Sequence, residues 1–364
     1  MDIAIIDADL IGRKKHRFPN LACEKISGYH KELGDNVVLK TDYENLDQYD
    51  KVFISKVFTD TPFNDDILKM PNVVGGGTGF FFDKAPDLPC KIEHHMPDYH
   101  LYDEWIEEQI SSGVNKSEFR EYIDYSIGFL SRGCFRKCAF CVNQKYDHVF
   151  KHSPLSEFYD PTRKKICMLD DNFLGWKDWK IVLEELITTG KPFKFKQGMD
   201  ERLLTDEKCE MLFNAKYDGD FTFAFDKIED YDLIHRKLEM IRRHTDKKSI
   251  KFYVLVGFES TDIMDIENAF KRIELLMRYS CLPYIMRFQN KNETPWKNSE
   301  YRGMYITLAR WCNQPSFFKK KSLREFVFKV DRSKAAMKYL SEFEEKHPEI
   351  ATKYFDLKYS DFEK

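Results

Sequence analysis

The sequence predicts an α/β protein: an N-terminal Rossmann-like parallel sheet, then a partial (β/α)6 barrel, then a C-terminal helical tail. Two observations lead to this class. Short apolar runs alternate with longer segments of helical periodicity, and such alternation is typical of parallel sheets. The chain has 364 residues, 42% of them hydrophobic, which is enough for two domains with packed cores.

The N-terminal domain is expected over residues 1–96. Its first strand is Ile3–Asp7, and a helix follows over 20–33, where apolar residues recur at helical spacing before Gly34 ends the period. Three more short strands are predicted at Val37–Leu39, Val52–Val57 and Val73–Val74. A polar connector, 97–122, then leads to the second domain.

The barrel domain is expected over 123–313, because six strand-like runs alternate there with helix-like segments. The predicted strands are Ile127–Ser131, Ile166–Leu169, Phe193–Lys196, Phe221–Phe225, Phe252–Val256 and Tyr284–Phe288. The predicted helices are Asp178–Thr189, Asp206–Lys216, Tyr231–His244, Ile263–Tyr279 and Glu300–Cys312. In such barrels the chemistry lies at the carboxyl ends of the strands. A C-terminal extension over 314–364 contains one predicted helix, Ser333–Lys346.

Composition and charge give no positive sign of a nucleic-acid or membrane partner. The chain carries 58 basic and 61 acidic side chains, a net charge of −3, so charge alone gives no footprint for nucleic acid or an anionic membrane. No apolar stretch approaches the ~20 residues of a membrane span. Acidic residues close to Met1 do not suit a signal peptide. We therefore expect a cytoplasmic protein without a membrane partner.

Three of the nine cysteines lie within eight residues, directly after the first barrel strand. They are Cys134, Cys138 and Cys141, in the spacing Cys-x3-Cys-x2-Cys, and basic side chains between them favour the thiolate form. Thiolates are the ligands of iron–sulfur clusters. Three close ligands leave one iron of a cubane cluster without a protein thiolate, and a cofactor can bind at that open position.

The same three cysteines also fit a structural zinc site, with His148 or His152 as the fourth ligand. Structural zinc is bound by four ligands, often as two separated pairs. The sequence has no second cysteine pair, and the loop follows a barrel strand. These features favour the iron–sulfur cluster.

On this spacing the chain resembles the radical S-adenosylmethionine (SAM) superfamily, over about 125–290. The resemblance implies a 4Fe-4S cluster whose open iron binds the amino and carboxylate groups of SAM. It implies that reductive cleavage of SAM gives a 5′-deoxyadenosyl radical, which abstracts hydrogen from a substrate. An electron donor such as flavodoxin or ferredoxin is implied as a partner. The aromatic Phe140, just before the last cysteine, is expected to contact the cofactor.

Polar residues end the second and third barrel strands. At the end of the second, Asp170, Asp171 and Asn172 stand where many members of the superfamily carry a Gly-Gly-Glu-like segment that accepts a hydrogen bond from the SAM amino group. Carboxylates and carbonyls supply such acceptors. An acidic helix N-terminus is the alternative interpretation.

At the end of the third strand, Gln197, Asp200 and Arg202 are suited to bind ribose hydroxyls and a carboxylate. The resemblance implies that this strand end contacts SAM. A salt-bridged loop is the alternative interpretation.

The N-terminal domain resembles the cobalamin-binding-type module that precedes the barrel in one radical SAM branch. The resemblance rests on the β/α order, on Val73-Val74-Gly75-Gly76 and on Pro97-Asp98-Tyr99. Histidine-ligated members present Asp-x-His-x-x-Gly after the first strand, whereas Asp7-Ala8-Asp9-Leu10 follows it here. We expect this fold without a histidine-ligated cobalamin, and cobalamin bound without a protein ligand stays open.

Three functional hypotheses follow. The first is a radical SAM enzyme with a single cluster, acting on an unidentified substrate. The second is a cobalamin-dependent radical SAM methyltransferase. The third, from another class, is a non-catalytic module that binds zinc or an iron–sulfur cluster.

Overall fold

The computed structural model describes residues 1–289 and 293–362. Backbone contacts divide the chain into two compact units, Met1–Lys196 and Gln197–Lys364, and each unit is described by itself below. The predicted α/β class is confirmed, because the three larger sheets are built from parallel strand pairs flanked by helices.

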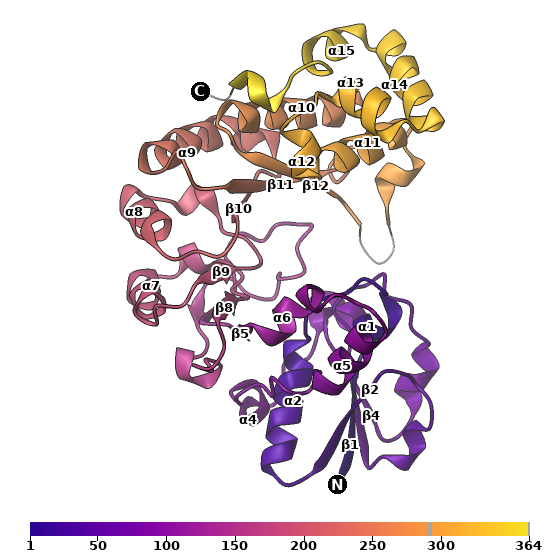
Figure 1. Cartoon of the computed structure of the whole chain (residues 1–364), viewed down its shortest axis with the longest axis vertical. Coiled ribbons are helices and arrows are strands. Elements are labelled where there is room, and N and C mark those ends of the chain that lie inside the picture. The colour runs from indigo at the N-terminus through magenta and orange to yellow at the C-terminus, as the bar shows by residue number, and fades with distance from the viewer. Residues whose placement is uncertain (290–292, 363–364) are drawn as a thin grey trace. The chain divides into compact units, whose positions relative to one another are not determined.

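The first unit opens with the predicted Rossmann-like sheet (Figure 1). Its four parallel strands are β1 (Asp2–Asp7), β2 (Asn36–Lys40), β3 (Lys51–Ser55) and β4 (Val73–Gly76), in the order β2-β1-β3-β4. Strand β1 lies inside the sheet, and its residues Ile3 to Ile6 are fully buried. All four strands were predicted, within one or two residues at most ends.

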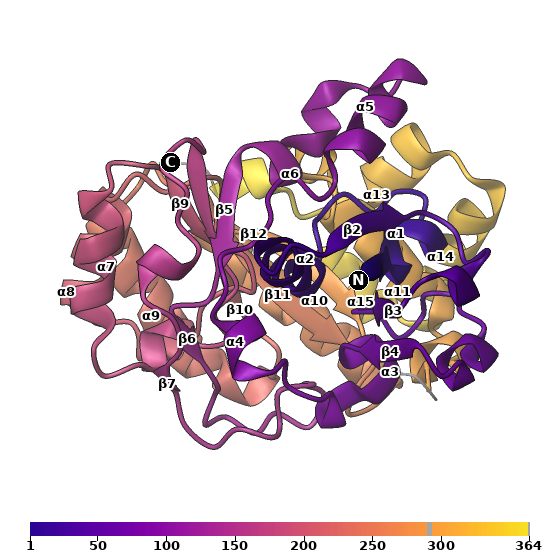
Figure 2. The same cartoon turned by 90° about the horizontal axis from the view of Figure 1, so that it is seen from below.

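Side-chain caps explain where the first two helices begin. The Asp7 carboxylate accepts hydrogen bonds from the backbone N–H groups of Asp9 and Leu10, which starts α1 (Ala8–Gly12) directly after β1. Asn20 caps α2 (Leu21–Glu32) in the same way. Helix α2 packs against the sheet and is seen end-on in Figure 2. Shorter helices of this part are α3 (Thr78–Phe81) and α4 (Cys90–Glu93).

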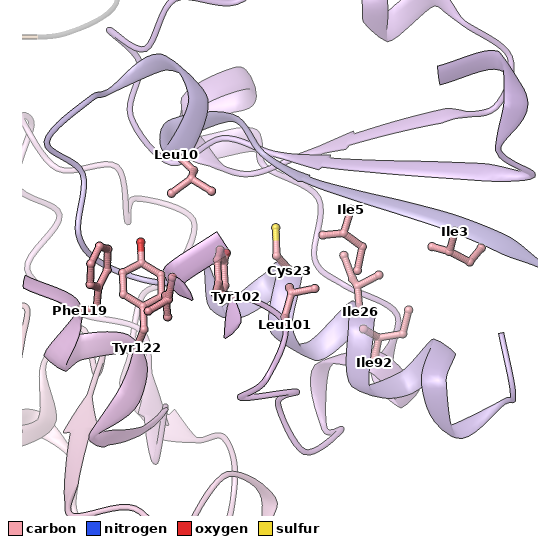
Figure 3. Packing of buried hydrophobic residues seen from close by; sticks show 11 residues of the cluster. Ile3, Ile5, Leu10, Cys23, Ile26, Ile92, Leu101, Tyr102, Phe119 and Tyr122 are labelled. Atoms are coloured by element: carbon pink, nitrogen blue, oxygen red, sulfur yellow. The ribbon is translucent and has the colours of Figure 1, made fainter. Parts of the chain in front are cut away.

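The connector expected at 97–122 is helical and contributes to the N-terminal core. It contains α5 (Asp103–Ser111) and α6 (Arg120–Ile123). Figure 3 shows Tyr102, Phe119 and Tyr122 beside residues of β1 and α2, all in one buried hydrophobic cluster. The four acids of α5 are exposed and its Ile106 is buried, so the polar composition of the connector comes largely from the outer face of one helix.

The six predicted barrel strands are all present, three in each unit. The first unit holds β5 (Tyr125–Gly128), β8 (Lys165–Met168) and β9 (Phe193–Phe195), in that order. The second unit holds β10 (Phe221–Ala224), β11 (Ile250–Val256) and β12 (Leu282–Arg287), also in chain order. Both sheets are parallel.

The five predicted barrel helices are also present: α7 (Trp179–Thr188), α8 (Asp206–Asn214), α9 (Tyr231–His244), α10 (Ile263–Arg278) and α11 (Arg302–Cys312). In the second unit, Arg272 of α10 is almost fully buried. Its guanidinium donates to the carbonyl oxygens of Phe225 and Leu255, at 3.0 and 2.9 Å. A single helix residue therefore ties α10 to the carboxyl ends of two neighbouring strands.

The C-terminal extension holds more helices than the one predicted. The expected helix is α14 (Lys334–Lys346), with Ser333 as its cap. It is accompanied by α12 (Pro315–Phe318), α13 (Leu323–Glu325) and α15 (Pro348–Tyr354). Among the described residues, no helix has both the length and the apolar character needed to cross a membrane. The boundaries 1–96, 97–122, 123–313 and 314–364 stay predictions.

Candidate cluster-binding site

The cysteine loop is closed at its base by two short strands. Strand β6 (Ser131–Arg132) pairs antiparallel with β7 (Phe150–Lys151), and Figure 2 labels both strands. Gly133, at the start of the loop, has a φ of +90°, and a Cβ atom there would lie 2.2 Å from the carbonyl oxygen of His148. Only glycine fits such a close approach of two backbone segments.

The three cysteines of the motif are half-buried, and none is in a disulfide. The backbone N–H of Arg136 donates to Sγ of Cys134 at 3.4 Å, and that of Asn143 donates to Sγ of Cys141 at 3.4 Å. Hydrogen bonds of this kind stabilise thiolates and influence the potentials of iron–sulfur clusters. The donor set of the loop therefore fits a 4Fe-4S cluster.

The loop is also braced by its own polar side chains. Gln144 Nε2 donates to the carbonyl oxygens of Cys138 and Ala139, both at 3.2 Å, and Lys137 Nζ donates to the carbonyl oxygen of Gln144 at 2.6 Å. These bonds hold the middle of the loop in shape within the protein itself. A ligand loop that is ordered in advance loses less conformational entropy when it binds a cluster.

The zinc alternative finds less support in the structure. Within residues 1–289 and 293–362, no group of three or more His, Cys, Asp or Glu side chains is arranged to hold a single metal ion. His148 lies 2.5 Å from a carboxylate oxygen of Asp147, and His152 Nε2 lies 3.1 Å from Oε1 of Glu93.

Asp170 holds the start of the cysteine loop. Its Oδ1 accepts from the backbone N–H and the hydroxyl of Ser131, both at 2.6 Å, and its Oδ2 accepts from the backbone N–H of Leu130 at 3.2 Å. Burial raises the pKa of Asp170 to about 7. Asp171 makes one further contact of this kind, from Oδ2 to the backbone N–H of Gly133 at 2.7 Å. Contact of Asp170 and Asp171 with SAM stays a prediction, and the sequence did not indicate these bonds to the loop.

Asn172 contacts Cys134, one of the three cysteines of the motif, directly. Its Nδ2 lies 3.3 Å from Sγ of Cys134, and its side chain is buried. It precedes the short helix η6 (Phe173–Gly175) but makes no capping hydrogen bond, which argues against the alternative of an acidic helix N-terminus. Phe140 lies in the loop, half-buried, and its contact with the cofactor stays a prediction.

The three candidates of the third strand end lie in the second unit. Gln197 is exposed, whereas Asp200 is buried. Arg202 Nε donates to Oδ1 of Asp200 at 2.7 Å, and its Nη1 donates to Oδ2 of Asp230 at 3.1 Å. Arg202 therefore takes part in a salt-bridge network, which is the alternative interpretation, and its contact with SAM stays a prediction.

Glu201 is a buried acid that makes the stability of the fold depend on pH. Burial raises its pKa to about 8, and its Oε2 accepts from the backbone N–H of Ala224 at 3.1 Å. The folded state holds this proton more tightly than the unfolded chain, in which the Glu201 carboxyl has a pKa of about 4.3. The protonated carboxyl therefore makes its full contribution to the free energy of unfolding below the pKa of the unfolded chain. This contribution is lost as the pH rises toward the pKa of Glu201 in the folded protein.

We expect the Glu201→Gln variant to be more stable than the wild type above pH 8 and equally stable below pH 4. The difference in the free energy of unfolding between the variant and the wild type should grow by up to about 1.4 kcal/mol for each pH unit between the two pKa values. Melting temperatures of both proteins across this range test the prediction. Parallel pH profiles for the two proteins would show that Glu201 is not protonated in the folded state.

The end of the first strand shows a motif that the sequence reasoning overlooked. Asp7, Asp9 and Gly12 have the spacing Asp-x-Asp-x-x-Gly, with aspartate where histidine-ligated cobalamin domains carry histidine. The Asp9 carboxylate accepts from the backbone N–H groups of Val57 and Phe58, at 2.6 and 3.4 Å, and from the hydroxyl of Thr61. Since Asp9 is buried and holds the segment after β3, this strand end does not fit a histidine-ligated cobalamin.

A Rossmann-like sheet is followed along the chain by six further parallel strands with intervening helices, and the three-cysteine loop comes directly after the first of these strands. No protein-family model matches the chain, and no curated protein matches it. Among solved structures, the chain is similar to the radical SAM methyltransferase TsrM from Kitasatospora setae, with cobalamin and a 4Fe-4S cluster bound. The alignment has 12% identity and a TM-score of 0.52, over 78% of this chain and 75% of that one.

Two structures of OxsB, described as a cobalamin-dependent SAM radical enzyme, align more weakly. One has aqua-cobalamin bound and the other aqua-cobalamin and SAM, with TM-scores of 0.35, identities of 14% and 13%, and coverage of 97% of this chain and 56% of that one. These two alignments are too weak to support an argument. The likeness to TsrM establishes a shared fold, so the fold expected from the cysteine motif is confirmed.

Proposed function

We propose that the chain is a radical SAM enzyme. Cys134, Cys138 and Cys141 hold a 4Fe-4S cluster with one open iron. When bound, the cluster would supply the electron that splits SAM into methionine and a 5′-deoxyadenosyl radical, and this radical would abstract a hydrogen atom from the substrate. The observation that carries this proposal is the half-buried three-cysteine loop with N–H donors to its sulfur atoms.

The other residues of the chain have supporting tasks in this proposal. Asp170 and Asp171 hold the start of the ligand loop through the bonds described above. SAM is bound by residues at the strand ends and by the aromatic residue of the loop. These are Phe140, Asp170, Asp171, Asn172, Gln197, Asp200 and Arg202.

The decisive experiment is anaerobic reconstitution with iron and sulfide, followed by incubation with SAM and a strong reductant. A brown protein with about four irons per chain that forms 5′-deoxyadenosine supports the proposal. A colourless protein that binds zinc with high affinity and no iron would instead support the non-catalytic module.

Replacement of Arg202 with Gln tests the proposed SAM contact. The apparent dissociation constant of SAM should rise about tenfold, because a charge-assisted hydrogen bond contributes about 1.5–3 kcal/mol. Equilibrium dialysis with labelled SAM measures the change. An unchanged SAM affinity with a lower melting temperature would assign Arg202 to the salt bridges with Asp200 and Asp230 alone.

The fold shared with TsrM favours a second candidate, a cobalamin-dependent radical SAM methyltransferase. Titration with hydroxocobalamin under anaerobic conditions separates it from the first. Stoichiometric binding would favour the methyltransferase. Replacing His100, which is exposed and paired with Asp103, should not alter that binding, since we expect no histidine ligand to cobalt.

A further inference from the structure

The side-chain amide of Asn172 contacts Cys134 through its nitrogen, and its oxygen is buried without a hydrogen-bond partner among the described residues. Its Nδ2 donates to Sγ of Cys134 at 3.3 Å, and only 3% of the residue is exposed. A thiolate can only accept a hydrogen bond, so the NH2 group of the amide faces the sulfur and Oδ1 faces away from it. Oδ1 is buried and has no hydrogen-bond partner among the described residues.

A buried acceptor that lacks a donor costs about 1–3 kcal/mol, so its presence calls for an explanation. The neighbouring turn keeps the amide in place. A Cβ atom on Gly175 would lie 3.4 Å from Cγ of Asn172 and 2.9 Å from the ring of Phe135 in the cysteine loop. The turn after β8 thus packs closely on both the amide and the ligand loop.

We propose that Asn172 is a positioning residue that couples the cluster to SAM. Its N–H raises the reduction potential of the cluster by stabilising negative charge on Cys134, and its Oδ1 accepts a hydrogen bond from the amino group of SAM. A donor on Oδ1 polarises the amide and strengthens its N–H as a donor, because hydrogen bonds in a chain reinforce one another. This inference rests on the proposed function and names a coupling within the same site.

The expected result is a lower reduction potential for the Asn172→Ala variant. Loss of the N–H···S bond disfavours the reduced, more negative cluster. We expect a tenfold change in the reduction equilibrium, which is about 59 mV for a one-electron couple. Anaerobic redox titration of the reconstituted protein, followed by the electron paramagnetic resonance signal of the reduced cluster, measures this shift. Saturation with SAM should raise the potential more in the wild type than in the variant.

Asn143→Ala is the matched control. Asn143 lies in the same loop and bonds to Sγ of Cys141 through its backbone N–H, which the substitution keeps. The reduction potential of the cluster in the Asn143→Ala protein should equal that in the wild type. A fully loaded Asn172→Ala protein with the wild-type potential would overturn the inference, although the proposed function would stand. A wild-type protein that binds no four-iron cluster would refute the proposed function itself.

A second measurement uses the wild-type protein, in case the Asn172→Ala variant does not bind iron. Asparagine labelled with ¹⁵N only in the side chain should give a hyperfine coupling to the reduced cluster. The coupling should persist in Asn143→Ala, which keeps the amide of Asn172. Absence of any coupling in the labelled wild type would also overturn the inference.

Discussion

Replacement of Cys138 with Ala is expected to abolish both iron binding and SAM cleavage. The proposed cluster has only three protein ligands, and the loss of one leaves two irons without a thiolate. Iron should fall from about four per chain to well below one. Iron analysis and the yield of 5′-deoxyadenosine after anaerobic reconstitution measure the two effects. The same result is expected for Cys134 and Cys141.

Cys90→Ala is the control for this prediction, because Cys90 is exposed and lies outside the motif. The other five cysteines are buried, and burial raises the pKa of the thiols of Cys23, Cys281 and Cys312. They are therefore poor candidates for a second cluster. A Cys138→Ala protein that kept its iron and cleaved SAM at the wild-type rate would refute the proposed function. About eight irons per wild-type chain would refute the single cluster.

Replacement of Asp170 with Ala is expected to release the start of the cysteine loop. The backbone N–H groups of Leu130 and Ser131 would lose their acceptor while buried. Each unsatisfied donor costs about 1–3 kcal/mol. Burial of the Asp170 carboxyl group is itself unfavourable, and it raises the pKa of this group to about 7. The substitution removes that unfavourable burial, which offsets part of the cost. We therefore expect a net loss of about 2–4 kcal/mol, together with a fall in bound iron.

Chemical denaturation of the protein without SAM, and iron analysis after reconstitution, measure these changes. Asp178→Ala is a suitable control. Asp178 lies after the same strand, before α7, and its side chain makes no capping bond, so its loss should leave stability and iron content unchanged. If Asp170→Ala kept its stability and iron and lost only SAM affinity, Asp170 would be a SAM ligand and not a brace of the loop.

Much of the fold was predictable because its signals are local. Helix α9 spans Tyr231–His244, with the bounds that the periodicity predicted. Each of the six strands predicted for the barrel overlaps its predicted range, although β5 (Tyr125–Gly128) begins two residues before and ends three residues before the predicted Ile127–Ser131. The polar composition of the connector did not reveal its helix, because α5 buries Ile106 and exposes its acids.

The sequence by itself located the candidate ligand loop, because three cysteines at close spacing can be recognised without knowledge of the fold. Only the tertiary structure decided which polar residues serve that loop. Asp170 bonds to residues 39 and 40 positions earlier, and Asp9 bonds to residues 48 to 52 positions later. A carboxylate at a strand end looks the same in the sequence whether it accepts hydrogen bonds from a cofactor or from a backbone N–H. Its actual partner depends on long-range packing, which local spacing does not encode.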